Sequence, residues 1–156
     1  MPQMYRKVPV LQDVASALNY LHSHRTPILH RDVSSANVLL EHSKPDRQWK
    51  AKLSDFGSAN LSFLAATPAE GAPIYAAPEV STEDRSRQTA KVDVYSFGVL
   101  VCEVCLCQFP PERAKFSSML SKVRPTAPNL FSLSRDCTSH APQDRPAMSV
   151  VLQRLK

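Results

Sequence analysis

Apolar residues recur every three or four positions between residues 8 and 24, which is the spacing of one face of a helix. The stripe consists of Leu11, Val14, Ala15, Leu18 and Leu21. Polar residues fill most of the positions between them, so the opposite face suits solvent. The pattern predicts an amphipathic helix of about four turns that leads the chain to His30.

Two short runs with strand character follow, at residues 37–41 and 51–55. They read "NVLLE" and "AKLSD", and a polar stretch separates them. We predict a β-hairpin whose loop is longer than a tight turn. Residues 57–77 are small, polar and proline-containing, which is typical of a long irregular loop with a functional role.

A longer apolar run, "KVDVYSFGVLVCEVCL", occupies residues 91–106. Its apolar residues cover nearly every side of a helical wheel, which predicts a helix buried in the core. A proline-rich connection between residues 110 and 128 follows, and two weaker helical patterns near 129–139 and 146–155 complete the chain. The predicted fold class is therefore mainly α with one small β-hairpin.

Length and charge add limits on the class of protein. A chain of 156 residues with 43% apolar and 21% charged residues is typical of one soluble globular domain. Residues 113–156 hold 8 of the Lys and Arg residues and 2 of the Asp and Glu residues, so the net charge of +5 lies there. These cations are scattered and lack interleaved aromatic residues, so we predict a solvated face and no nucleic-acid partner.

The same apolar run bears on two further questions, namely whether the cysteines bind a metal and whether the chain spans a membrane. Cys102, Cys105 and Cys107 lie inside or beside it, and neither they nor Cys137 find a second ligand pair at zinc spacing, so we predict free buried thiols. The run is too short and, at Glu103, too polar for a bilayer span, and no apolar signal segment begins the chain. We expect no membrane segment in this chain and a cytoplasmic location, either alone or as part of a larger signalling protein.

Candidate chemistry begins at "HRDVSSANVLL", residues 30–40, where several polar residues directly precede an apolar run. Buried polar groups are costly unless they are partnered, so this arrangement indicates a site. Together with "SDFGSA", "YAAPEV" and "DVYSFG", in this order, the segment resembles the motif set of the protein kinase family. The resemblance covers essentially the whole chain, residues 1–156, and is to the helical C-terminal lobe, with a catalytic loop at 30–37 and an activation segment at 55–79.

The resemblance implies roles for four residues at the reaction centre. Asp32 resembles the catalytic aspartate, which orients the substrate hydroxyl and accepts its proton. Asn37 and Asp55 resemble the ligands of Mg²⁺, which bridges them to the phosphates of ATP. Leu39 resembles the floor beneath the adenine. The implied cofactors are ATP and Mg²⁺, and the implied partner is a protein substrate.

Other residues resemble the family's supporting and regulatory positions. His30 and Phe56 look like packing residues that align the two loops, and Gly57 completes the "DFG" motif. Arg31 looks like the cation that meets a phosphorylated activation segment, for which Thr67 is the first choice because it is central and precedes a proline.

Three further residues resemble architectural positions, and Tyr75 is expected to be a packing residue. Glu79 of "APE" resembles a carboxylate buried against a late arginine, for which Arg145 is the matching position. Asp93 resembles the carboxylate at a helix start that holds the backbone of the catalytic loop.

The departures from the family pattern bear on which type of substrate residue accepts the phosphoryl group. Ser34 stands two residues after Asp32, where serine/threonine kinases usually carry lysine, and Ala72 stands where they generally have threonine. A similar Ser-Ser loop, with "DVYSFGVL" and "DRPAM", occurs in the tyrosine-kinase-like group. Its members mostly phosphorylate Ser and Thr, which is the expected acceptor class here, with Tyr open.

A complete kinase also needs a glycine-rich loop, a strand lysine and a helix glutamate. The three glycines of this chain are Gly57, Gly71 and Gly98, and the predicted first helix fills the residues before His30. We therefore expect the N-terminal β lobe to be absent, the isolated chain to be incomplete as a kinase, and its uncovered apolar surface to bind a partner protein. The alternatives are a catalytically inactive interaction or regulatory module and, as the weakest, nucleic-acid binding.

Overall fold

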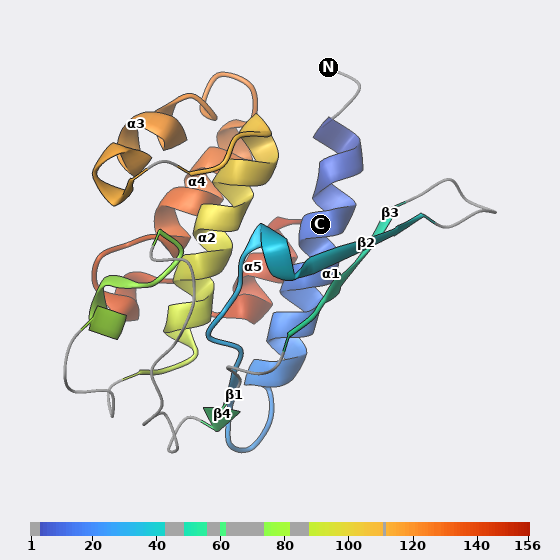
Figure 1. Cartoon of the computed structure of the whole chain (residues 1–156), viewed down its shortest axis with the longest axis vertical. Coiled ribbons are helices and arrows are strands. Elements are labelled where there is room, and N and C mark those ends of the chain that lie inside the picture. The colour runs from blue at the N-terminus through green and yellow to red at the C-terminus, as the bar shows by residue number, and fades with distance from the viewer. Residues whose placement is uncertain (1–3, 43–48, 56–59, 62–73, 82–87, 111) are drawn as a thin grey trace.

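The computed structural model describes residues 4–42, 49–55, 60–61, 74–81, 88–110 and 112–156. Its helices are α1 (Met4–His22), α2 (Lys91–Leu106), α3 (Phe116–Ser121), α4 (Pro128–Cys137) and α5 (Met148–Arg154). Its strands are β1 (Ile28–Leu29), β2 (Val38–His42), β3 (Trp49–Leu53) and β4 (Asn60–Leu61). The described part is mainly helical, as the sequence pattern predicted (Figure 1).

Helix α1 buries the stripe that the periodicity predicted. Leu11, Val14, Ala15 and Leu18 are fully buried, and Leu21 is nearly so. The helix packs against α2, α5 and β3, so its apolar face covers one side of the core. It begins at Met4, four residues before the predicted start, although Pro9 within it cannot donate a backbone hydrogen bond.

Helix α2 lies at the centre of the molecule, between α1 and α4 (Figure 1). Its bounds are those predicted, and all of its residues except Lys91, Val104 and Leu106 are buried. It ends at Leu106, and the next residue, Cys107, adopts the left-handed backbone conformation (φ 51°) common just after a helix. Several of its buried residues are polar, and some of them contribute to the candidate site described below.

Helix α4 packs closely against α2 at Gly98. The hydroxyl of Ser134 donates a hydrogen bond of 2.6 Å to the carbonyl oxygen of Gly98. A Cβ atom added at Gly98 would lie 2.7 Å from Cys137 Cβ and 2.8 Å from Thr138 Cγ2. Distances this short require the two helices to separate.

We therefore expect Gly98→Ala to lower the free energy of unfolding by about 1–3 kcal/mol, the range for an overfilled core. Urea denaturation of the full chain measures the change. Ser149→Ala, on the exposed side of α5, is the matched control and should change stability by less than about 0.5 kcal/mol. Equal stability of the Gly98 variant and the control would contradict the close approach.

Strands β2 and β3 form the predicted antiparallel hairpin, with pairs running from Val38 opposite Leu53 to His42 opposite Trp49. It packs on α1 and extends beyond it (Figure 1). A second antiparallel pair, β1 with β4, joins residues 28–29 to residues 60–61. The sequence analysis did not predict this pair, because two residues are too short to show an alternating pattern.

Two other expectations need correction. The proline-rich connection between residues 110 and 128 contains the helix α3, whose Phe116, Met119 and Leu120 are buried. Cys107 is exposed rather than buried, because it follows the end of α2. Cys102, Cys105 and Cys137 are buried as predicted, and burial raises their thiol pKa values to about 12, 11 and 12.

None of the described helices combines the length and the apolar character that a membrane span requires.

Candidate active site

Asp93, near the start of α2, holds the backbone of the segment that begins at His30. Its two carboxylate oxygens accept hydrogen bonds from the backbone N–H groups of His30 (2.9 Å) and Arg31 (2.8 Å). His22 Nε2, at the end of α1, lies 2.8 Å from the same carboxylate. Asp93 is fully buried, so these contacts replace the water that the carboxylate loses.

The backbone is strained at two candidate residues. Arg31 (φ 69°) and Asp55 (φ 61°) adopt the left-handed conformation, which residues other than glycine rarely adopt. Such a conformation costs about 1–3 kcal/mol and persists only where the surroundings enforce it. At Arg31, the hydrogen bond from the backbone N–H to Asp93 helps to hold the backbone in this conformation.

Asp32 and Asn37 are joined by a short turn of 3-10 helix, η1 (Ser35–Asn37). Asn37 Nδ2 donates to Asp32 Oδ2 and to the carbonyl oxygen of Asp32, both at 2.8 Å. The amide therefore fixes the orientation of the Asp32 carboxylate. The backbone of Asn37 is itself held, because its carbonyl oxygen accepts from the Ser54 N–H at 2.8 Å.

Ser54 also connects this end of the hairpin to His30, whose Nε2 lies 3.1 Å from the Ser54 carbonyl oxygen. Asn37 directly precedes β2, and Asp55 follows β3 by two residues. Since Val38 pairs with Leu53, the hairpin brings Asn37 and Asp55 to the same end. Asp32, Asn37 and Asp55 are thus gathered at one place, together with His30.

Asn37 and Asp55 have the donor chemistry that a magnesium ion needs. The two bonds to Asp32 use both donors of the Asn37 amide, which leaves its oxygen as the remaining polar atom. Asp55 is an exposed carboxylate. Mg²⁺ binds oxygen ligands and keeps several waters, so one amide oxygen and one carboxylate beside a nucleotide's phosphates fit this ion.

The structure describes one of the remaining candidates of the reaction centre and its neighbouring motifs. Leu39, on β2, is 57% exposed and lies opposite Lys52. Its apolar side chain is therefore accessible to a flat ligand. Phe56, Gly57 and Thr67 lie outside the described residues.

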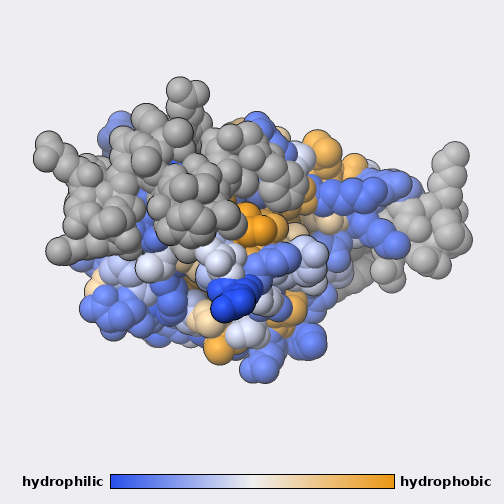
Figure 2. Space-filling model, turned by 90° about the horizontal axis from the view of Figure 1, so that it is seen from below, coloured by the Kyte–Doolittle hydropathy of each residue, from blue (hydrophilic) through white to orange (hydrophobic). Residues whose placement is uncertain are grey.

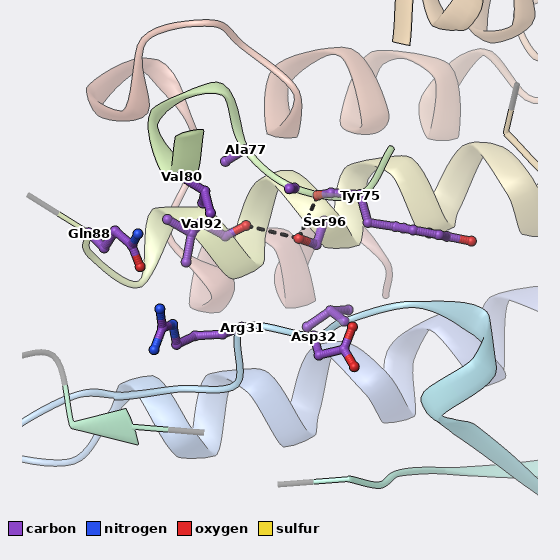
Figure 3. Close-up of a pocket in the computed structure, with 10 residues that line it drawn as sticks. Arg31, Asp32, Tyr75, Ala77, Val80, Gln88, Val92 and Ser96 are labelled. Carbon is purple, nitrogen blue, oxygen red and sulfur yellow. Dashed lines mark hydrogen bonds between the residues drawn. The ribbon is translucent and has the colours of Figure 1, made fainter. Parts of the chain in front are cut away.

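A narrow cleft, whose enclosed space of about 20 Å³ has room for about one water, lies between the segment 31–33 and the start of α2. Its wall is formed by Arg31, Asp32, Val33, Tyr75, Ala76, Ala77, Val80, Gln88, Val92 and Ser96. Figure 3 shows Arg31 and Gln88 toward one end of the cleft, with Asp32 and Tyr75 toward the other. The cleft therefore adjoins Asp32 on the side away from the hairpin.

Tyr75 makes polar contacts that the sequence analysis missed. Its hydroxyl donates to Glu103 Oε2 of α2 and lies 3.4 Å from Ser35 Oγ. Tyr75 and Glu103 are buried, and Ser35 is partly buried. Burial and the hydrogen bond to Glu103 raise the pKa of Tyr75 to about 12. The sequence predicted only a packing role for Tyr75. It did not indicate the hydrogen bond to Glu103, because Glu103 lies 28 residues away inside an apolar run.

The raised pKa of Tyr75 predicts a pH-dependent contribution to stability. The unfolded tyrosine ionises near pH 10 and the folded one near pH 12, so the contribution is complete below pH 10 and lost as the pH rises to 12. We expect Tyr75→Phe to cost about 1–2 kcal/mol at pH 8, from the lost bond to Glu103, and less at pH 11.5. Urea denaturation at both pH values measures this difference.

Tyr20→Phe is the control, because Tyr20 is 68% exposed. Comparing each variant with the wild type at the same pH removes the effect of the buried thiols, whose raised pKa values lower stability over an overlapping pH range. A loss of unfolding free energy in Tyr75→Phe that stays constant from pH 8 to pH 11.5 would contradict a raised pKa of the Tyr75 hydroxyl.

Arg145, which is fully buried, and Glu79, which is partly buried, form an ion pair with two parallel contacts. Arg145 Nη1 lies 2.6 Å from Glu79 Oε1, and Nη2 lies 2.8 Å from Oε2. The same guanidinium donates to the carbonyl oxygens of Lys91, Ser139 and His140 and stacks over the ring of Tyr95 at 5.0 Å. This pair ties η4 (Pro78–Ser81) to the C-terminal part of the chain.

The chain belongs to the protein kinase family, since the family model described as protein kinase domain matches residues 5–154. The serine/threonine-protein kinase CTR1 of Arabidopsis thaliana is 31% identical over 164 residues, covering 97% of this chain and 19% of that protein. The probable serine/threonine-protein kinase drkA of Dictyostelium discoideum is 34% identical over 160 residues, covering 96% and 24%. The L-type lectin-domain containing receptor kinase I.7 of A. thaliana is 33% identical over 180 residues, covering 97% and 26%.

These comparisons confirm the protein kinase resemblance inferred from the four motifs. The chain spans about a quarter or less of the length of each of these three relatives. Protein kinases in general use ATP and Mg²⁺ and act on protein substrates.

Proposed function

We propose that this chain supplies the catalytic residues for ATP- and Mg²⁺-dependent phosphoryl transfer to Ser or Thr of a protein substrate, with Tyr as a further acceptor. The observation that carries the proposal is the pair of bonds from the Asn37 amide to Asp32, at the end of the hairpin where Asp55 also lies. A general base, an amide oxygen and a carboxylate are the side chains that this chemistry requires.

In the proposed mechanism Asp32 accepts the proton of the substrate hydroxyl. Asn37 holds Oδ2 of that carboxylate, so Oδ1 is the oxygen that faces the hydroxyl. Bound Mg²⁺ would neutralise charge on the ATP phosphates. Asn37 and Asp55 would hold it through their side-chain oxygens. Phosphoryl transfer depends mainly on positioning and charge stabilisation, and the buried Asp93 contributes by fixing the backbone before Asp32.

We assign residues 1–156 to the C-terminal lobe of a kinase domain, with the catalytic loop at 30–37 and the activation segment at 55–79. The glycines of the chain stand at 57, 71 and 98, and none belongs to a glycine-rich phosphate loop. Transfer therefore needs a second structural unit to cover the nucleotide. The exposed Leu39 and Leu40 offer apolar surface next to the site for such a unit.

The acceptor is assigned to Ser and Thr because two of the relatives above carry serine/threonine-protein kinase in their names. Ser34, at the usual lysine position, is buried here. No cation from that position meets the transferred phosphoryl group, so its charge is left to other groups. The tyrosine-kinase-like motifs of the sequence support the same acceptor class.

Regulation by phosphorylation of the activation segment belongs to the same proposal. Arg31 lines the cleft beside Asp32, and a guanidinium binds a phosphate through two parallel hydrogen bonds. Thr67 is the first candidate for the modified residue.

The alternative is an interaction module that binds a partner protein without catalysis. The exposed apolar side chains Leu39, Leu40, Trp49 and Phe109 favour it. On the face seen in Figure 2, however, apolar residues form small separate areas among polar ones rather than one continuous patch. The intact set of Asp32, Asn37 and Asp55 favours catalysis, because a scaffold would not require it.

Magnesium-dependent nucleotide binding separates the two functions. We expect isothermal titration of the chain with ATP to show weak binding that needs Mg²⁺ and that falls at least about tenfold in Asp55→Asn, which loses a charged metal ligand. Asp144→Asn removes an exposed carboxylate elsewhere and should bind like the wild type. ATP binding that does not depend on Mg²⁺ and does not change in Asp55→Asn would favour the interaction module.

A further inference from the structure

The surface carries a groove that the proposed mechanism does not use. It lies where η4, α2, α3 and the end of α4 meet, and it is open to solvent with a volume of about 510 Å³. Ligand sites in proteins have volumes of about 300–1,000 Å³, so the groove has room for several side chains of a partner. The narrow cleft beside Asp32, by contrast, has room for about one water.

The groove combines buried apolar residues with exposed basic ones. Phe116 and Leu120 of α3 and Tyr95 of α2 are buried and supply its apolar part. Its exposed basic residues are Arg113, Arg135 and His140. None of the described residues that line it is acidic. This lining is complementary to a partner that carries carboxylates next to apolar side chains.

Arg135 is the basic residue best placed to contact such a partner. Its side chain is 62% exposed, and the carboxylate of Asp136 that it contacts also lies 2.9 Å from Arg154, so two guanidinium groups share one negative charge. Arg135 contacts Asp136 through Nε and Nη2, so Nη1 keeps its N–H donors for a carboxylate of another molecule. Arg113 has a different role, because it donates to the carbonyl oxygen of Ala76 and holds the wall of the groove.

The groove lies next to the candidate active site. Residues 75–77 line the cleft beside Asp32, and the next residue, Pro78, lines the groove. On α2, Ser96 lines the cleft and the adjacent Tyr95 lines the groove. A protein substrate whose hydroxyl lies at Asp32 can therefore reach the groove with side chains a few positions away in its sequence.

We propose that this groove binds an acidic and apolar segment of the protein substrate. The Arg135 guanidinium contacts an Asp or Glu carboxylate of that segment, and an apolar side chain beside it packs on Phe116 and Leu120. The chain thereby selects substrates that carry acidic residues near the phosphorylated Ser or Thr. The inference rests on the proposed phosphoryl transfer to a protein and adds the chemical class of the segment that is recognised.

Peptide binding to the full 156-residue chain, without ATP and Mg²⁺, tests this inference. The probe is a synthetic peptide with aspartate and leucine on both sides of one serine, and its comparison peptide has asparagine in place of each aspartate. Nuclear magnetic resonance follows the backbone amides of Ser117, Thr138 and His140, which line the groove. We expect the acidic peptide to shift these signals and to bind at least about tenfold more tightly than the comparison peptide, because several carboxylates meet a basic surface.

In Arg135→Met the preference for the acidic peptide should fall below about threefold, since an exposed ion pair contributes up to about fivefold. Arg124→Met is the matched control, because it removes the same charge from an exposed arginine outside the groove and should keep the preference. The melting temperature of Arg135→Met should match that of the wild type. The comparison of the two peptides on the wild-type chain tests the inference independently of any variant.

Three results would overturn the inference. They are equal binding of the two peptides, an equal loss of preference in both arginine variants, and tighter binding of a single-stranded oligonucleotide than of the acidic peptide. The last two would indicate a general attraction of anions to the basic surface.

A nitroxide label beside the serine separates a substrate from another kind of partner. We expect the bound, labelled peptide to broaden the backbone amide signal of Asp32, and binding in the groove without this broadening would contradict a substrate segment. Asp55→Asn should bind the acidic peptide like the wild type while it loses magnesium-dependent ATP binding. Failure of the groove and failure of the proposed function are therefore distinguishable.

Discussion

Replacing Arg145 with methionine is expected to lower the free energy of unfolding by about 3–5 kcal/mol, the cost of breaking a buried ion pair. Arg145 is 1% exposed and contacts both carboxylate oxygens of Glu79. Its removal takes this cation away from Glu79 and leaves three backbone carbonyl oxygens without this donor. Urea denaturation of the chain measures the loss.

The control for this prediction is Arg135→Met. Arg135 also contacts a carboxylate, Asp136 at 2.9 Å, but its side chain is 62% exposed. Exposed ion pairs contribute about 0–1 kcal/mol, so this variant should remain close to the wild type. A double variant with Glu79→Leu should be less destabilised than the sum of the two single variants, because no buried charge is left unpaired. A loss below about 1 kcal/mol for Arg145→Met would contradict the buried pair.

The helices could be predicted because burial leaves a periodic record in the sequence. The stripe of α1 repeats every three to four residues and is buried, and the continuous apolar run of α2 matches its burial on all sides. The short helix α3 escaped prediction although Phe116, Met119 and Leu120 stand at helical spacing, because the prolines on both sides of its segment favoured an irregular connection. The pair of β1 and β4 is too short to produce any period.

The candidate site was predictable in its residues and not in its geometry. Asp32, Asn37 and Asp55 stand in recognisable motifs, and the hairpin that gathers them follows from two apolar runs. The left-handed backbone at Arg31 and Asp55 has no sequence signal, because neither residue is glycine. Local preference and the folded structure disagree there, which is typical of functional sites.

Contacts between polar residues that are far apart in the sequence could not be predicted either. Tyr75 and Glu103 meet across 28 residues, and Gln88, which precedes α2, lines the same cleft as Arg31 and Asp32. A glutamate inside an apolar run and a glutamine before a helix are both common on protein surfaces. Their burial, and so their importance, becomes visible only in three dimensions.

The largest effect on activity is expected for Asp32→Asn, measured in a fusion protein that joins the N-terminal lobe of a related kinase to this chain. A positioned general base contributes about 10²- to 10⁴-fold to the rate, and asparagine cannot accept the proton of the substrate hydroxyl. Asparagine keeps an oxygen that can accept the hydrogen bond from Asn37, so the loop should retain its structure. Single-turnover phosphorylation of a Ser- and Thr-containing peptide library measures the loss.

Two comparisons show whether that loss arises from the chemistry at Asp32. Circular dichroism and the melting temperature of Asp32→Asn should match the wild type, because the side chain is not fully buried and its size is unchanged. Affinity for ATP in the presence of Mg²⁺ should also be kept, since Asn37 and Asp55 remain, whereas Asp55→Asn should lose affinity together with rate. A single-turnover rate of Asp32→Asn equal to that of the wild type would falsify the assignment of Asp32 as the base. The interaction module would then become the better explanation of why this chain keeps its motifs.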